Sequence, residues 1–445
     1  MAREWAAQDV SAPMPFGDTA PPAGAVRTFN PQLDSDWFRD FEGTSRCGRH
    51  ARVQIWADGS TRRWIAVRTS HLDALGAAAA RELAAALTDA AEERGGGADD
   101  MKHPGILVDR LKLMFDWYEG MVDQRTGRLF YLYDPQSDLA IGDGEPIRDI
   151  ASVWDVEVLS AFLGRDDLSD LIQRSLAHFD RQVIMRDGYA IVAPGRESSS
   201  IAHSAFLVLA LARSELPDRA QRLTPLADGI LRWQRDDGSY RVFFDAAPDV
   251  GEELYPAEAM LALLDAYRLT RDARYLHSVE RGFGHYKRGY YDRGLLDPHL
   301  LVFFANWQSQ AGRALCAATS RPEVKDLVRT FLFELQDRII GSGFYDRVAR
   351  RPEAQACVEV ACGLEGLADT YAIAISSRDP RASDYQRCIK IALGFLVRAQ
   401  RTTGGTDRER GGFGGSLTSR EQRVDVTGHV ASGFIKSVDN GITEP

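Results

Sequence analysis

The sequence lacks the features that would place it outside a reducing compartment or in a membrane. No run reaches the ~18 uninterrupted apolar residues that a spanning helix needs, and no apolar core follows Met1–Trp5 as it would in a signal peptide. Cysteine is scarce, with no CxxC pair and no cysteine–histidine spacing suited to zinc. The cysteines number five: Cys47, Cys316, Cys357, Cys362 and Cys388. We therefore expect a reduced, cytoplasmic protein without membrane insertion and without a metal or organic cofactor.

The chain also lacks an excess of positive charge. Across 445 residues it has 54 Lys and Arg against 64 Asp and Glu, a formal net charge of -10. Nucleic acids and anionic membranes attract basic surfaces, so neither is expected as a partner. Hydrophobic residues make up 44% of the chain, enough to bury a large core. We interpret the acidic excess as a contribution to solubility.

What recurs along the chain is a pair of helices joined by a turn rich in glycine and aromatic residues. A spacing of roughly 50 residues lies in the range of stacked supersecondary units. The six turns fall at 127–131, 187–189, 237–240, 292–295, 343–345 and 411–415. A repeat of this kind predicts an architecture, and it also predicts where a site can lie.

Two types of helix alternate between these turns. Amphipathic helices with apolar residues at a period of 3.6 belong on the outside, and we expect them near 103–119, 166–184, 217–235, 272–288, 322–341 and 383–401. Apolar, Ala-rich helices belong inside, near 147–163, 199–213, 254–269, 302–317, 355–371 and 425–438. Twelve helices in six pairs predict a mainly α fold, an (α/α)6 toroid over residues 101–445.

Residues 1–100 read as a small α+β appendage. Residues 1 to about 40 are rich in Pro, Ala and Asp and are expected to form an arm. The alternating runs 52–56 and 63–67 flank Asp58-Gly59, which is a strong hairpin signal. An Ala-rich helix is expected over 71–93.

The connection lengths predict the position of a site. Short loops lead from each inner helix to the next outer helix, so the long Gly-aromatic loops share the opposite rim. The six inner helices then point their positive N-termini at that rim, and polar residues in their first turns face its mouth. Residues of reactive types there include Asp155, Glu197, Ser198, Glu258 and Asn306. Carboxylates mixed with aromatic rings suit a carbohydrate, because rings stack on sugar C–H faces and carboxylates bind hydroxyls.

Each candidate also has an ordinary structural interpretation. Acids at helix starts serve as caps, and a lone histidine on an apolar helix is more often a satisfied core residue. Glu252-Glu253 stands out because both acids precede Pro256 and only one can cap. Asp425 and His429 share one helix face at a spacing of four. The DDxxD run at 166–170 resembles a magnesium–diphosphate motif, but it starts an outer helix on the far rim and reads as a cap.

The same segments resemble a known superfamily. The run 251–259 with the helix pair after it, and 411–417 followed by Arg423, Asp425 and His429, are similar to six-hairpin (α/α)6 toroids. In particular, the pattern is similar to that of bacterial proteins of the D-glucuronyl C5-epimerase and N-acylglucosamine-epimerase type, over residues ~103–440. A second, weaker resemblance links 233–240 and 400–414 to the turns of squalene-cyclase-like α-toroids. The class II cyclase DxDD motif is absent, so that resemblance implies only the toroid.

We therefore predict a carbohydrate-active enzyme, a hydrolase, lyase or epimerase, that acts on a sugar or uronic-acid-containing small molecule or oligosaccharide. Glu253 and Asp425 are the expected acid/base pair, assisted by Tyr255 and His429. The expected substrate-binding residues are Arg148, Asp149, Trp154, His203, Trp307, Tyr345 and Arg423. Two alternatives stay open: an isoprenoid or natural-product cyclase with an aromatic-lined pocket, and a non-catalytic scaffold that binds a protein. The lining of the interior distinguishes them.

Overall fold

The computed structural model describes residues 105–142, 146–193, 199–244, 250–403 and 407–445, and three strands nearer the N-terminus. The chain divides into two compact units. One comprises Met1–His103 with Arg351–Ala354, and the other comprises Pro104–Arg350 with Gln355–Pro445.

The first unit contains a three-stranded antiparallel sheet. Its strands are β1 (Arg39–Thr44), β2 (His50–Ala57) and β3 (Arg63–Thr69), in the order β1-β2-β3. β2 and β3 pair with Ile55 opposite Ile65 and Trp56 opposite Trp64, as expected for the predicted hairpin. β1 was not predicted from the sequence. The expected arm up to residue 38, the Asp58-Gly59 turn and the expected helix at 71–93 lie outside the described residues.

The second unit is helical, and its helices follow the predicted alternation. The outer helices are α3 (Ile106–Gly120), α5 (Ser169–Asp180), α7 (Arg219–Arg232), α9 (Ala273–His285), α11 (Pro322–Gly341) and α14 (Ala382–Ala399). The inner helices are α4 (Pro146–Leu163), α6 (Ile201–Arg213), α8 (Tyr255–Thr270), α10 (Leu301–Ala318), α13 (Cys357–Ser376) and α15 (Val424–Asp439). A further short helix, α12 (Phe344–Arg350), occupies the fifth rim connection, where only a turn was expected.

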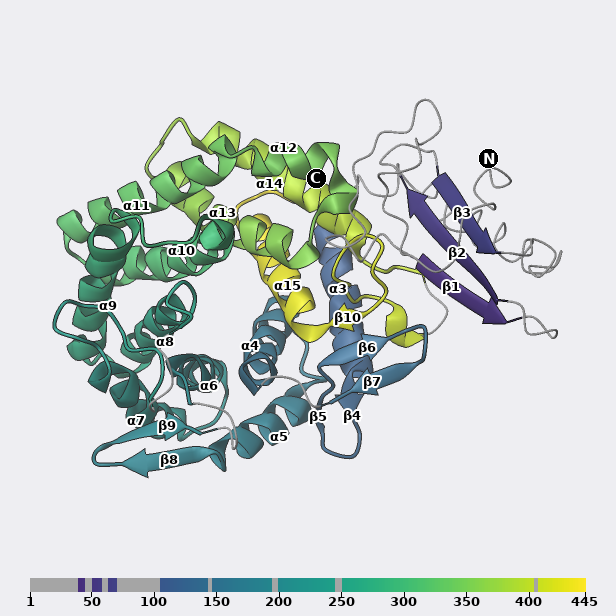
Figure 1. The fold of residues 1–445 in the computed structure, drawn as a ribbon. Helices are drawn as coiled ribbons and strands as arrows, with labels where there is room; N and C mark the ends of the chain where they lie inside the picture. Colours follow the sequence, from purple (N-terminus) through teal and green to yellow (C-terminus); the bar gives the residue numbers. More distant parts are fainter. Residues whose placement is uncertain are drawn as a thin grey trace. The chain divides into compact units, whose positions relative to one another are not determined.

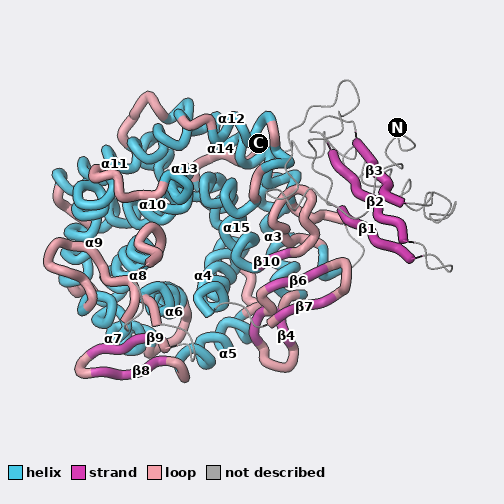
Figure 2. The backbone as a smooth tube through the Cα atoms, viewed as in Figure 1, coloured by secondary structure: helices cyan, strands magenta, loops and turns pink. Residues whose placement is uncertain are grey.

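The inner helices form a closed ring. Each packs on the next in the order α4, α6, α8, α10, α13 and α15, and α15 packs back on α4. Each outer helix covers the groove between two inner neighbours, as α7 does with α6 and α8 (Figures 1 and 2). The predicted (α/α)6 toroid of twelve helices is therefore confirmed.

Burial explains the two helix types. Every residue of α6 from Ile201 to Ala212 is buried, because an inner helix has neighbours on all sides. α9 instead buries a single stripe that includes Tyr275, Val279 and Phe283, at the spacing of one helical face. None of the described helices combines the length and the apolar character of a membrane-spanning segment.

Short hairpins and single helical turns lie at the rim where the inner helices begin. The strands are β4 (Val122–Asp123), β5 (Arg128–Leu129), β6 (Leu132–Asp134), β7 (Leu139–Ile141), β8 (Val183–Arg186), β9 (Tyr189–Val192) and β10 (Gln422–Arg423). The short helical turns of this unit are η3 (Tyr286–Tyr291), η4 (Pro298–Leu300) and η6 (Asp407–Glu409), whereas η5 (Pro352–Ala354) belongs to the first unit.

The first and last helical pairs are joined by hydrogen bonds as well as by packing. β10 pairs with β6, so that Gln422 lies opposite Tyr133. The Trp117 indole N–H donates to Gln422 Oε1 at 2.8 Å, and the Tyr118 hydroxyl donates to the Val424 carbonyl at 2.8 Å. These bonds connect segments about as far apart in the unit as the chain allows, and they close the ring at the start of α15.

Close helix packing inside the ring predicts a stability effect at Gly366. A Cβ there would lie 2.7 Å from the Asn306 Cα, so α13 could not keep its approach to α10. Gly366→Ala is expected to lower the free energy of unfolding in urea by about 1–3 kcal/mol, the usual cost of overpacking. Gly341→Ala, at the end of α11 with nothing within 4 Å, is the control and should lose no stability. Equal stability of the two variants would contradict the packing argument.

Candidate active site inside the ring

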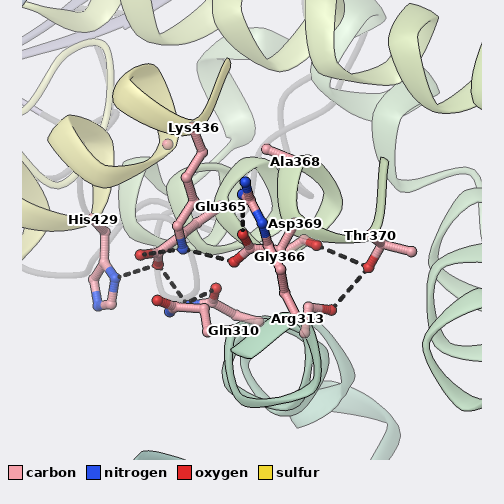
Figure 3. A network of polar contacts seen from close by, with 12 residues as sticks. Gln310, Arg313, Glu365, Gly366, Ala368, Asp369, Thr370, His429 and Lys436 are labelled. Atoms are coloured by element: carbon pink, nitrogen blue, oxygen red, sulfur yellow. Dashed lines mark hydrogen bonds and ion pairs between the residues drawn. The ribbon is translucent and has the colours of Figure 1, made fainter. Parts of the chain in front are cut away.

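The best-connected polar group inside the ring is the carboxylate of Glu365 on α13. Its side chain is 1% exposed. His429 Nδ1 lies 3.0 Å from Glu365 Oε2, the Asn306 amide donates to the same oxygen at 2.8 Å, and Lys436 Nζ donates to Oε1 at 3.4 Å (Figure 3). Three partners from α10 and α15 therefore converge on one buried carboxylate.

Charge stabilises this arrangement. Burial alone would raise the pKa of Glu365, but Lys436 and His429 outweigh it and lower the pKa to about 2. Burial likewise would lower the pKa of His429, yet its contacts with Cys362 and Glu365 hold that pKa well above the usual value. At neutral pH the pair is an imidazolium beside a carboxylate.

A row of aromatic rings crosses the interior next to this pair. Trp154 on α4 lies 6.2 Å from Phe206 on α6, and Phe206 lies 5.7 Å from Trp307 on α10. Trp307 in turn meets His429 at 5.8 Å, edge to face. Because α6 and α10 are not neighbours in the ring, nor are α10 and α15, these contacts run across its interior. The predicted residues Trp154, Trp307 and His429 therefore lie in one connected interior cluster.

A second cluster lies at the start of α15. Arg423 Nε donates to Asp425 Oδ1 at 3.0 Å, and Arg148 Nε lies 3.1 Å from Asp425 Oδ2. Both guanidinium carbons lie within 6 Å of the Tyr131 ring centroid, at 5.8 Å for Arg148 and 5.7 Å for Arg423. The two arginine side chains are 36% and 30% exposed. Two partly exposed arginine side chains thus lie beside the Asp425 carboxylate.

Glu253 and Tyr255 lie at the start of α8, which is separated from α15 by two inner helices in either direction around the ring. The Tyr290 hydroxyl donates to Glu253 Oε1 at 2.9 Å, and the Tyr255 ring packs edge-on to Phe243 at 6.5 Å. Glu253 and Asp425, the expected acid/base pair, therefore lie on opposite sides of the ring.

The remaining predicted residues have local roles. Asp149 is buried and forms an ion pair with Arg128 of β5. His203 Nδ1 lies 2.8 Å from Ser200 Oγ in the cap of α6, and burial lowers the pKa of His203 to about 4, so its ring is neutral. Tyr345 is buried on α12, and its hydroxyl donates to the Gly363 carbonyl at 3.0 Å. These contacts of the three residues lie outside the clusters around His429 and Asp425.

The DDxxD run lies beside the end of α3 and the hairpin of β4 and β5. There Arg165 donates to Asp167 at 2.8 Å and Arg174 donates to Asp170 at 2.9 Å, so both acids form surface ion pairs. Among the described residues, no group of three or more His, Cys, Asp and Glu side chains is arranged to hold a metal ion. Two other candidates at the mouth, Glu197 and Ser198, lie outside the described residues.

Two further acids in the interior were not selected from the sequence. Burial raises the pKa of Asp155 on α4 and of Glu258 on α8 to about 8, and both feel the charge of His429. Their signal was present, since a charged residue inside an Ala-rich, apolar helix needs an explanation. Because both acids lie near the rim, where the inner helices begin, they could also be interpreted as ordinary helix caps.

The polar network continues along the ring axis below Glu365. Lys436 Nζ lies 2.8 Å from Asp369 Oδ2, and Arg313 donates to Asp369 Oδ1 at 2.8 Å (Figure 3). Charges of opposite sign therefore alternate from His429 through Glu365, Lys436 and Asp369 to Arg313.

This alternation predicts that Lys436 is important for stability. Lys436→Met would leave two buried carboxylates, Glu365 and Asp369, short of a cation, so we expect a loss of about 3–5 kcal/mol in the free energy of unfolding. Lys112→Met, which breaks an exposed pair with Asp109, should change stability by less than about 0.5 kcal/mol. Urea unfolding measures both, and similar losses would contradict the buried-network argument.

The same substitution has a pH signature. Since the folded-state pKa of Glu365 is depressed to about 2 from 4.5, its ionisation stabilises the fold above pH 4.5 and that contribution is lost as the pH falls toward 2. With Lys436 replaced, the pKa of Glu365 should be lowered less, and the free energy of unfolding should depend less on pH in this interval.

Comparisons with known proteins place the fold but not a family. No protein-family description matches the sequence, and no curated protein matches it. By structure, the chain is similar to (α/α)6 toroid enzymes, and the expected resemblance to six-hairpin toroids is confirmed.

Three of the similar structures illustrate the range. D-mannose isomerase has a TM-score of 0.58 at 9% identity, covering 76% of this chain and 100% of that one. Cellobiose 2-epimerase from Bacillus thermoamylovorans has a TM-score of 0.56 at 10% identity, covering 74% and 97%. Unsaturated glucuronyl hydrolase from a Bacillus species has a TM-score of 0.55 at 11% identity, covering 76% and 98%. At such identities the likeness concerns the fold alone.

Proposed function

We propose that this protein is a carbohydrate-active enzyme, a hydrolase, lyase or epimerase, which acts on a sugar or uronic-acid-containing substrate by acid/base catalysis within the mouth of the barrel. The observation that carries the proposal is the contact of the His429–Glu365 pair with Trp307 in the interior of the ring. A charged proton-transfer group beside an aromatic face is what a pyranose ring requires. The names of the similar structures, which include an isomerase, epimerases and glucuronyl hydrolases of sugars, support the same class.

The anionic part of the substrate is assigned to the cluster at the start of α15. Arg148 and Arg423 place two partly exposed guanidinium groups beside Asp425. The inner helices all begin at this rim, and their N-termini add positive potential there. A uronic acid carboxylate fits the bidentate geometry that arginine offers. Trp154 and Trp307 then provide stacking faces for the ring.

Glu253 and Asp425 remain the proposed acid/base pair, with Tyr255 and His429 assisting proton transfer. The two residues lie at the starts of inner helices on opposite sides of the ring, and a substrate in the mouth would have to reach both. Asp425 also accepts from Arg423 and pairs with Arg148. It could therefore act on the substrate directly or hold the two arginines in place, and variants separate these roles.

A cyclase is the second candidate because the aromatic row of Trp154, Phe206 and Trp307 could stabilise a carbocation. The acids that accompany these rings favour the sugar instead.

Isosteric replacements test the acid/base pair. Glu253→Gln and Asp425→Asn should fold normally. Their turnover of the sugar on which the wild type is active should fall by a factor of about 10²–10⁴, the usual contribution of a general acid or base. His429→Gln, measured in the same assay, shows whether the interior cluster is needed for turnover. Glu215→Gln, in the exposed loop between α6 and α7, is the control and should keep full activity. Full activity in both the Glu253 and the Asp425 variants would reject the pair, whereas loss in His429→Gln alone would move the chemistry to the interior.

Ligand selectivity tests the anion site. In a thermal-shift series, uronic acids should raise the melting temperature more than the matching neutral sugars and more than prenyl diphosphates. Arg148→Met should remove the advantage of uronic acids over neutral sugars, because one of the two guanidinium groups is lost. In turnover, KM for the charged substrate should rise about tenfold or more with kcat little changed. Stabilisation by prenyl diphosphates alone would favour the cyclase.

A further inference from the structure

Two carboxyl groups inside the ring have no role in the account above. Glu258, in the first turn of α8, is 4% exposed, and its Oε2 has no hydrogen-bond partner among the described residues. A glutamate is almost never fully buried unless it is paired, and a buried polar atom without a partner calls for an explanation. A group that binds a ligand at this point provides one.

The carboxyl of Asp155 on α4 packs against α15 at a point where that helix has no side chain. A Cβ at position 428 would overlap the Asp155 carboxyl, so glycine at 428 leaves the room that this carboxyl occupies. His429 is the next residue along α15. The carboxyl therefore reaches the helix that carries the imidazolium.

The charges around the two acids are those of the interior clusters. Asp155 faces His429, Asp425 and Lys436 from α15, Glu365 from α13 and the Tyr118 hydroxyl from α3. Glu258 faces His429. Burial raises the pKa of both carboxyls to about 8, so both carry a proton at neutral pH.

We propose that Asp155 and Glu258 are catalytic residues that contact one substrate from different sides of the ring and donate protons to it. α4 is the direct neighbour of α15, whereas α8 lies across the ring from it. A substrate stacked on Trp307 beside His429 would then meet Asp155 on the near side and Glu258 on the far side. This inference rests on the proposed function and adds two proton donors to the acid/base pair proposed there.

The step balances with water as the only further reactant. A neutral carboxyl gives its proton to the glycosidic oxygen while the C–O bond breaks and its electron pair moves to that oxygen. Water then adds to the anomeric carbon that the broken bond leaves electron-deficient. The carboxylate that remains lies near the His429 imidazolium, which stabilises it. Water, or the next proton transfer in the reaction, restores the proton. A donor of this kind works only while it is protonated, so activity should be present below and lost above a pH of about 8.

Glu157 provides a matched control on the same helix. It is 7% exposed, both of its carboxyl oxygens lack hydrogen-bond partners among the described residues, and burial raises its pKa to about 9. The charge that it feels is Arg213 at the end of α6, not His429. Glu157 is therefore protonated like Asp155 and Glu258 but does not feel the charge of His429.

The experiment joins infrared spectroscopy with kinetics. Asp155→Asn, Glu258→Gln and Glu157→Gln should each remove the carbonyl-stretch signal of one protonated carboxylic acid at pH 7. Because an amide replaces a neutral acid of the same shape, folding should persist, and circular dichroism checks it. Turnover of the responsive sugar should fall at least about a hundredfold in the first two variants and stay unchanged in Glu157→Gln.

The outcomes separate this inference from the proposed function. If the wild type turns over a sugar while Asp155→Asn and Glu258→Gln keep full activity, the inference is overturned and the proposed function stands. If the wild type turns over no sugar of the series, both are overturned. Should a variant fail to fold, the wild-type profile decides: kcat that does not fall above pH 8 overturns the inference, and a fall there supports it.

Discussion

The ionised carboxylate of Glu365 is the interaction on which the interior of this ring depends. An isolated buried carboxylate would be costly, and in practice it would take up a proton. Here Lys436 and the His429 imidazolium compensate, and Asn306 supplies a neutral donor. The partners come from α10 and α15, so the pair of helices on either side of α13 is fixed by one group. A toroid whose core were wholly apolar would have no such constraint on the rotation of its inner helices.

The consequence of that pairing is a division of charge inside the ring. With Glu365 ionised, His429 stays charged, and a second ionised carboxylate nearby would have to be desolvated without a full partner of its own. Asp155 and Glu258 therefore hold their protons. At the mouth, where side chains reach solvent, Asp425 pairs with two arginines instead. Ion pairs thus occur both at the opening and around Glu365, whereas Asp155 and Glu258 stay neutral.

Much of this architecture could be predicted from the sequence because the repeat is periodic. The alternation of amphipathic and Ala-rich helices reflects a simple physical difference: an outer helix buries one stripe and an inner helix buries its whole surface, as α9 and α6 do. Helix bounds followed to within a few residues. The short helix α12 and the strand β1 were missed, since each is a few residues long and neither has a period to detect.

The candidate site was harder to predict because residue type and helix position do not reveal partners. Arg148, Arg423 and Asp425 could be selected as candidates because all lie at the start of an inner helix, and Trp307 and His429 follow within the next turns. Tyr345 looks the same in the sequence, yet its hydroxyl is satisfied by the Gly363 carbonyl. Glu258 looked like an N-terminal acid that favours the helix dipole, but burial keeps it neutral, and a neutral acid gains little from that dipole. The distinction lies in what surrounds each carboxyl, which is a property of helices brought together from distant parts of the chain.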